Sequence, residues 1–436
     1  MEWPILLLIF FGAIIVLLMT GLPIAFVFML VTMGGALTLW GGAPGMELIV
    51  LNMQVAVSSF TLLAIVEFTL MGMVIFHSGM GTTMLRVLGD WLGGVPGRLA
   101  IIGIAFATLF ATLSGSSLAA STVMATVITP EMERQGYKKP MSLGPILGGG
   151  GLAMLIPPSG LAIVLAAIAN ISVIKILIGG AIPGLMLAAL YMIYIITRAA
   201  IQKDLAPAYF VTRPPFFRRV RDNLVYVLPL GLIVFLTLGL IFLGVATPSQ
   251  SAVTGALGSF LLAGLYGKLN WSLVKISLRG TIRVAVMILM IFASSATFSQ
   301  ILAFAGITRG LGNFASTLPV PPIMVIVGMM IVVLILGTIM EVVSIFMVTI
   351  PIFMPVVEAL GFDPIWFGLL MLLNAEMALT TPPFGTSLFA VKAAAPAGTT
   401  MRDVYLAALP FLGCDLVVLI ILIVFPGVAL WLPNLL

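Results

Sequence analysis

The chain has 436 residues, of which 62% are hydrophobic and only 8% are charged. This composition excludes an ordinary soluble domain and indicates a polytopic helical membrane protein, because apolar stretches of about 20 residues recur along the chain. The formal charge of +5 reports membrane topology rather than nucleic-acid binding, since its lysines and arginines lie mostly in loops. The single cysteine, Cys414, excludes an internal disulfide, and no zinc spacing, phosphate-binding loop or nucleophile motif indicates an enzyme.

The apolar segments of the first half differ in kind. The hydropathy pattern predicts two spans, a short amphipathic segment, a third span, two interrupted stretches and a last span, near residues 4–19, 22–40, 44–56, 57–79, 99–129, 141–170 and 180–198. An interrupted stretch of about 30 residues would form a helix of about 45 Å, too long for a hydrocarbon core of about 30 Å. We therefore expect each to break at its poor helix formers, which read LSGSSL at 113–118 and LIPPSG at 155–160.

The second half of the chain repeats the first. A shift of 225 residues places six prolines on prolines, where about one match is expected by chance. The matching pairs are Pro4/Pro229, Pro23/Pro248, Pro96/Pro321, Pro130/Pro355, Pro157/Pro382 and Pro158/Pro383. We predict two copies of one unit, residues 1–215 and 222–436. The amphipathic segment of the second copy, residues 268–283, carries four basic residues that indicate a helix in the headgroup region.

Loop charges suggest how the interrupted stretches cross the membrane. If the first stretch of each copy is a re-entrant hairpin and the second a broken span, 17 of the 19 basic residues share one membrane face, against 14 for the reverse assignment. The pattern thus predicts hairpins at 99–129 and 323–355, and broken helices at 141–170 and 364–393. Five full crossings per copy would invert the second copy and leave both termini outside. The expected fold is an all-α membrane protein of two inverted repeats.

Inverted repeats with discontinuous helices are typical of secondary transporters. Unwound backbone at mid-membrane must bind protein, water, ions or substrate, because lipid offers it no hydrogen bonds. Carbonyl and hydroxyl oxygens at helix ends suit Na⁺, whereas helix N-termini suit a carboxylate. The alternative is that glycine and proline merely kink packed helices. Four breaks paired by the repeat favour two cation sites flanking one anion site.

At these residues the chain resembles the large membrane subunit of tripartite ATP-independent periplasmic (TRAP) transporters. The similar stretches are SGSSLAASTVMATVITPEMERQGY, IPPSGLAIV, KILIGGAIPGL and PIFMPVVEALGFDPIWFGLLMLLNAEMALTTPPFG. The resemblance covers essentially the whole chain. It implies an elevator-type, Na⁺-coupled importer of a small organic acid anion in the bacterial inner membrane, whose scaffold and transport domains each draw on both repeats. A stand-alone Na⁺ or H⁺ carboxylate symporter is the alternative.

The resemblance also implies partners and site residues. The partners are a small four-helix membrane subunit, expected as a separate chain, and a periplasmic binding protein that delivers the substrate. The residues expected to bind Na⁺, at two or more sites, are Ser114, Gly115, Ser116, Ser117, Pro157, Pro158, Ser159, Gly337, Thr338, Met340, Glu341, Thr380, Thr381 and Pro382. Those expected to contact the anion are Ser117, Ser159, Asn374, Glu376, Pro383, Thr386 and Ser387. The chain departs from the family pattern at Glu67 and Glu341.

Four acidic residues in apolar surroundings are further candidates, because such residues are costly within a membrane. Glu341 and Glu376 adjoin helix breaks, and both a site role and a structural role are open for them. For Glu67 and Asp415 the pattern favours a structural partner or a contact with the small subunit. The only histidine, His77, is expected to be a capped interfacial residue rather than a proton relay.

Overall fold

The structure is a computed structural model that describes residues 2–58, 60–91, 95–114, 117–207, 214–338 and 340–435. Over these ranges it contains helices and turns and no β-strand. Five of the described helices are long and apolar enough to cross a membrane, or up to seven spans if each of two bent helix pairs is one span. The expectation of an all-α, multi-pass membrane protein is therefore confirmed for this part of the chain.

The first half of the chain is a succession of helices. They are α1 (Trp3–Met19), α2 (Ile24–Leu39), α3 (Ala43–Val57), α4 (Phe60–His77), α5 (Met80–Gly89), α6 (Arg98–Ser114), α7 (Ser117–Arg134), α8 (Lys139–Leu155), α9 (Gly160–Ala169) and α10 (Val173–Ile201). The predicted hairpin corresponds to α6 and α7, which pack against each other. The predicted broken helix corresponds to α8 and α9, which bend by 46° at their break.

The second half follows a short link, α11 (Phe216–Asp222) and a π-helical turn (Asn223–Val227). Its helices are α12 (Leu228–Phe242), α13 (Pro248–Leu265), α14 (Trp271–Phe304), α15 (Ile307–Thr317), α16 (Pro322–Gly337), α17 (Val342–Ala359), α18 (Pro364–Thr380), α19 (Thr386–Ala394), α20 (Met401–Val424), α21 (Pro426–Leu430) and a 3₁₀ turn (Pro433–Leu435). The starts of α17 and α18 lie 225 residues after those of α7 and α8. Helix bounds thus recur at the spacing of the sequence repeat, whereas the inversion of the second copy stays a prediction.

One pair of equivalent segments differs between the halves. Residues 44–79 form two helices, α3 and α4, but the amphipathic segment 268–283 continues into the next span as the single helix α14. The expected separate surface helix is therefore the first part of a helix of 34 residues, about 51 Å long. The Ser58 hydroxyl donates to the Gln54 carbonyl oxygen (2.7 Å) after α3, but Ser294 and Thr297 make the same kind of bond inside α14 without ending that helix, so this bond does not explain the difference.

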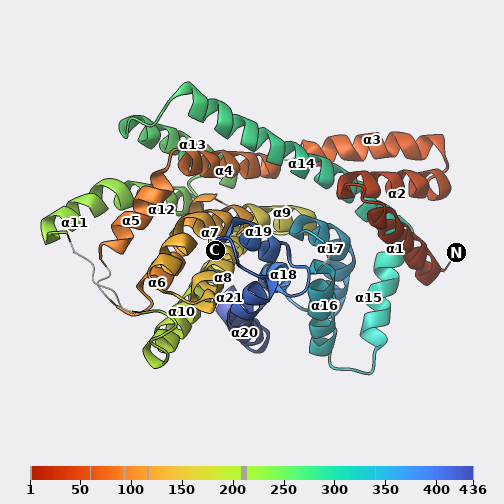
Figure 1. The fold of residues 1–436 in the computed structure, drawn as a ribbon. Coiled ribbons are helices and arrows are strands. Elements are labelled where there is room, and N and C mark those ends of the chain that lie inside the picture. Colours follow the sequence, from red (N-terminus) through yellow and green to blue (C-terminus); the bar gives the residue numbers. More distant parts are fainter. Residues whose placement is uncertain are drawn as a thin grey trace.

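The helices form a layer that lies against a larger body (Figure 1). The layer consists of α2, α3, α4, α13 and α14, which pack on one another along the upper edge of the view. The body below it contains α6–α10 and α16–α20. α9 packs against both α4 and α14, so it lies where layer and body meet. This interface brings the helix breaks of the body next to the long helices of the layer.

α8 is the central helix of the body and is buried along its length from Met141 to Leu155. One full turn of it, Gly148–Gly151, carries no side chains. Cβ atoms added at these four glycines would meet, in order, the Phe411 ring, Ala107, Ser121 and Glu376. The glycine turn therefore lets α20, α6, α7 and α18 approach the α8 backbone, which unites both halves of the chain around one helix.

Candidate functional site

A cavity of about 470 Å³ lies between the layer and the body. On the layer side, α4 and α14 contribute Thr69, Met73, His77 and Ile288. On the body side, the first residues of three helices line it: Ser117 of α7, Gly160 of α9 and Val342 of α17. We call it the N-end cavity, because the N-terminal ends of these helices meet there. The predicted helix breaks therefore open onto one shared space.

The helix N-termini give the N-end cavity a positive bias. The first N–H groups of a helix lack partners within it, and aligned peptide dipoles add partial positive charge at that end. α7 begins at Ser117, inside the LSGSSL break, and α9 begins after Pro157–Pro158, because proline cannot continue a helix. Among the lining residues that the structure describes, His77 is the one side chain that can carry positive charge, and Glu341 the one that can carry negative charge. The cavity is suited to a small anion.

At the first break, the structure joins two predicted site residues from opposite halves. The Ser117 hydroxyl donates to Glu376 Oε2 (3.2 Å), and both residues are buried. Glu376 Oε1 has no hydrogen-bond partner among the described residues. Glu376 also packs on Gly151, which precedes it by the 225 residues of the repeat, so equivalent positions of the two copies touch. The glutamate of one copy fills the space that the glycine of the other leaves.

The second break also brings helix ends together. Gly337, the last residue of α16, packs against Ala378, two residues before α18 ends. Glu341 caps the start of α17, where its Oε2 accepts the Val343 N–H (3.1 Å). The hydroxyl of Thr381 donates to the carbonyl of Met377 within its own helix (2.6 Å). This region therefore offers backbone carbonyls, hydroxyls and one carboxylate, which are hard oxygen ligands suited to Na⁺.

The remaining residues predicted to bind Na⁺ lie outside the described part of the chain or away from the N-end cavity. Gly115 and Ser116 lie outside the residues that the structure describes, as does the side chain of Ser114. Pro157 lines a separate apolar cavity of about 550 Å³ beside α12. Thr338 and Thr380 donate to carbonyls of their own helices. Pro158, Met340 and Pro382 complete the two break segments without lining the N-end cavity.

Several residues predicted to contact the anion do not line the N-end cavity. Asn374 is buried and donates to the Met330 carbonyl of α16 (2.7 Å). Ser159 caps α9 by accepting the Ala162 N–H (3.2 Å). Thr386 and Ser387 begin α19, which packs on α7, and their buried hydroxyls have no partner in the described chain. The Pro383 carbonyl accepts the Tyr405 hydroxyl. Of the predicted substrate contacts, Ser117 is the one that the structure places at this cavity.

The acids and the histidine fall into distinct environments. Asp415 is buried and accepts the Tyr191 hydroxyl, so it has the structural partner expected for it. Glu67 Oε2 is buried without a partner among the described residues. His77 Nδ1 lies 2.9 Å from the Met73 carbonyl oxygen, in the last turn of α4, which agrees with a capped histidine. Its place on the cavity wall was not foreseen, because a lone histidine in sequence gives no sign of what faces it.

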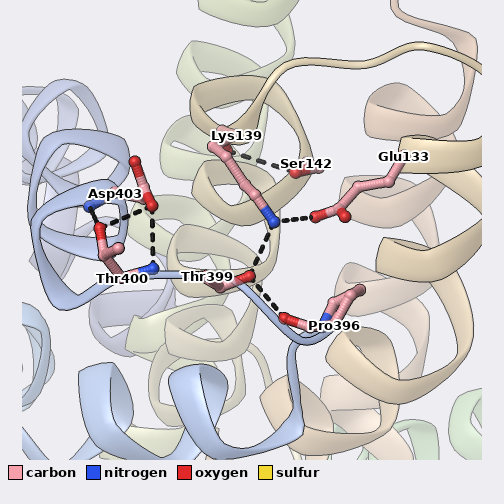
Figure 2. A network of polar contacts seen from close by, with 7 residues as sticks. All are labelled: Glu133, Lys139, Ser142, Pro396, Thr399, Thr400 and Asp403. Carbon is pink, nitrogen blue, oxygen red and sulfur yellow. Dashed lines mark hydrogen bonds and ion pairs between the residues drawn. The ribbon is translucent and has the colours of Figure 1, made fainter.

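A polar network at the opposite end of α8 joins the two halves again (Figure 2). The Lys139 ammonium donates to Glu133 Oε1 (2.6 Å) and to the Thr399 hydroxyl (2.7 Å). Thr399 in turn donates to the Pro396 carbonyl (2.8 Å) in the loop between α19 and α20. This network ties the base of the first hairpin to the second half, away from the N-end cavity. In the repeat the position of Lys139 is taken by Pro364, so the second half has no equivalent.

Residues 11–428 match the family model of the tripartite ATP-independent periplasmic transporter, DctM component. The chain belongs to this family. The chain is 34% identical over 380 residues, 86% of each chain, to a C4-dicarboxylate TRAP transporter large permease protein of Pseudomonas aeruginosa. It is 29% identical to the protein of the same name from Rhodobacter capsulatus, over 98% of this chain and 99% of the relative.

Solved structures agree with this assignment at the level of the fold. The YdaH transporter of Alcanivorax borkumensis aligns with a TM-score of 0.62 over 88% of this chain and 89% of that chain. The sequence identity is 15%, so this likeness shows the fold alone. The chain is thus a membrane permease subunit by family, and the two relatives named above are transporter permeases.

Proposed function

We propose that the chain is the large permease subunit of a TRAP transporter that imports a small organic acid anion, driven by Na⁺. The observation that carries this proposal is the N-end cavity, where the N-termini of α7, α9 and α17 converge. A cavity of about 470 Å³ fits a small organic molecule. Ser159 already caps α9 and the Glu341 carboxylate already caps α17, so the α7 N-terminus is the helix end proposed to attract a carboxylate there without a buried arginine or lysine.

Na⁺ would bind at the two pairs of helix breaks beside this cavity. At the first, Ser117 and the unpartnered Glu376 Oε1 supply oxygens, and at the second, Glu341 and the carbonyl ends of α16 and α18 do so. A cation there would compensate carboxylates that otherwise lack a basic partner among the described residues. Cation and anion sites would thus share the same helix ends, so that filling one favours filling the other.

His77 is the scaffold-side contact for the anion in this proposal. With Nδ1 engaged at the Met73 carbonyl, Nε2 is left as the polar atom of the ring. The basic side chains on helices packed against α4, which are Arg86, Arg98, Lys275, Arg279 and Arg283, do not line the cavity.

The body would move past the layer as an elevator. The helix breaks belong to the body, whereas α4 and α14 belong to the layer, so sliding would carry the cavity between membrane faces. The tripartite family supports two partners, a small four-helix membrane subunit and a periplasmic substrate-binding protein. The chain would lie in the bacterial inner membrane with both termini on the periplasmic side, as its loop charges predict.

Thermal unfolding of the purified complex with its small subunit tests the cation sites first. We expect a rise in Tm in NaCl over KCl, LiCl and choline chloride at matched ionic strength, since a ligand at a hundredfold excess over its Kd stabilises by about 2.7 kcal/mol. Uptake of labelled succinate into proteoliposomes then tests the coupling. Uptake that ignores the Na⁺ gradient would contradict the proposal.

A further inference from the structure

A second cavity of about 450 Å³ lies farther along the interface between layer and body. We call it the C-end cavity, because the last turn of α9 and its cap, Ala166 to Asn170, border it. α3 and α14 complete its wall with Asn52, Phe292, Ser295, Ser299 and Gln300. Among the described lining residues the polar groups are amides and hydroxyls, and none is charged.

The two cavities follow one another along the same pair of helices. On α14, Ile288 borders the N-end cavity and Phe292 borders the C-end cavity. On α9, Val164 borders the first and Ala166 the second. Four residues of helix rise by about 6 Å, so the barrier between the cavities is about one helical turn thick. Since α14 qualifies as a membrane span, the two cavities lie at different depths.

Two amides mark the C-end cavity as a place for a polar ligand, because Asn52 and the exposed Gln300 both line it. Ser295 belongs to the same wall, but its Oγ is itself buried and does not reach the cavity. The amides of Asn52 and Gln300 add N–H donors, which a carboxylate accepts without a charged partner. The negative end of the α9 dipole opposes an anion here, which makes binding weaker than at the N-end cavity.

We propose that the two cavities are the two ends of one substrate route, and that Asn52, Ser299 and Gln300 contact the organic anion on the membrane face opposite to His77. This inference rests on the proposed transport of an organic anion. The loop charges assign the faces: α8 and α9 run from Lys139, on the basic cytoplasmic side, to Asn170 at the other side. The C-end cavity therefore lies toward the periplasm and the N-end cavity toward the cytoplasm. As the body slides, an anion held at its helix breaks would move from Asn52, Ser299 and Gln300 of the layer to His77 of the layer.

Site-directed labelling tests the two faces without knowledge of the substrate. Cys414 is replaced by alanine, and a single cysteine is introduced as Gln300→Cys or His77→Cys, both exposed positions. A membrane-impermeant methanethiosulfonate reagent is applied to spheroplasts and to inverted membrane vesicles. We expect Gln300→Cys to react at least tenfold faster in spheroplasts, and His77→Cys at least tenfold faster in inverted vesicles. Leu257→Cys, an apolar exposed position in α13, is the control that reacts from neither side.

Reaction of both cysteines from the same face, or of neither, would overturn the route. This outcome does not depend on Na⁺ coupling, so it separates the inference from the proposed function. If the faces are opposite but no Na⁺-driven uptake occurs, the proposed function fails and the two-ended path stands. Opposite faces together with Na⁺-driven uptake support both.

Directional kinetics then test the substrate contact itself. The complex with its small subunit is reconstituted, and succinate is the probe for uptake and for efflux. We expect Gln300→Leu to raise KM at least fivefold from the periplasmic face and less than twofold from the cytoplasmic face. Thr69→Val, at the wall of the N-end cavity, should do the reverse. Equal changes in both directions, as a merely structural role would give, contradict the contact.

Discussion

The two ends of α9 carry cavities of similar size and opposite character. The N-end cavity, about 470 Å³, gathers three helix N-termini, His77 and Glu341. The C-end cavity, about 450 Å³, is lined by amides, hydroxyls and the last turn of α9. The same helix therefore presents its positive end to one space and its negative end to the other. In the proposed transport route, helix direction more than side-chain charge makes the N-end cavity the more favourable of the two for an anion.

The largest effect is expected from filling the glycine turn of α8. Gly151→Val would drive a side chain into Glu376 and displace it from Ser117, which destabilises the body by about 3 kcal/mol. Thermal unfolding measures the loss. The control is Gly413→Val, a helical glycine with open space around it. If both variants unfold alike, the close packing of α8 does not hold the wall of the N-end cavity.

Removing one hydroxyl at each cavity should have different effects on stability and on the response to Na⁺. Ser117→Ala would leave the buried Glu376 carboxylate without its hydrogen bond, at a cost of about 2 kcal/mol. The stabilisation by NaCl should fall with it, because Ser117 borders the proposed cation site. Ser295→Ala, whose hydroxyl has no partner to lose, should keep the stability and the Na⁺ response. Unfolding curves in NaCl and KCl compare the two, and equal losses would count against the cation site.

His77 offers the N-end cavity a ring nitrogen from the layer. Its Nε2 can hydrogen-bond a carboxylate, so His77→Gln should raise KM for cytoplasmic-side succinate about fivefold, or about 1 kcal/mol. Glu341 faces the same cavity, so Glu341→Gln in the His77→Gln background shows how far the neighbouring carboxylate opposes the anion. An unchanged KM in His77→Gln would exclude the imidazole as a contact for the anion.

The smallest effect concerns the network that lies away from the N-end cavity. Lys139→Met would break the contacts to Glu133 and Thr399 and lower the unfolding free energy by about 1 kcal/mol, because the pair is only partly exposed. KM should be unchanged in both directions. Arg134→Met, at a more exposed ion pair with Glu131, should cost less. A changed KM in Lys139→Met would show that the network around Lys139 is coupled to the transport site.

The positions of the helix breaks could be predicted from the sequence, because glycine, serine and proline act locally on the backbone. LSGSSL and LIPPSG end and begin helices at the expected residues, and α17 and α18 follow by the repeat. The continuity of α14 was missed, since an amphipathic segment does not reveal whether the helix stops after it. The wall supplied by α4 and α14 was missed for another reason. The sequence does not distinguish the wall residues Thr69, Met73 and Ile288 from residues that only pack between helices, because the cavity forms only where the body lies against the layer.

Glu376 shows a further limit of such prediction. The sequence marks it as a buried acid before a break, but its partners, Ser117 and Gly151, lie more than 200 residues earlier. The interpretation as a structural acid and the interpretation as a site residue both find support. One carboxylate oxygen of Glu376 accepts a hydrogen bond, and the other has no partner among the residues that the structure describes. The sequence could not predict which oxygen of Glu376 is bonded, because its partners come from the other half of the chain.

The glycine turn of α8 has a consequence for biosynthesis. During synthesis α8 is complete long before α18 and α20, whose Glu376 and Phe411 press against Gly151 and Gly148. Until α18 and α20 have been synthesised, the glycine turn of α8 can pack only against helices of the first half of the chain. A ribosome that stops after the first copy would therefore release a chain with an open flank in the lipid, a target for membrane proteases. The body is finished only when the second copy arrives.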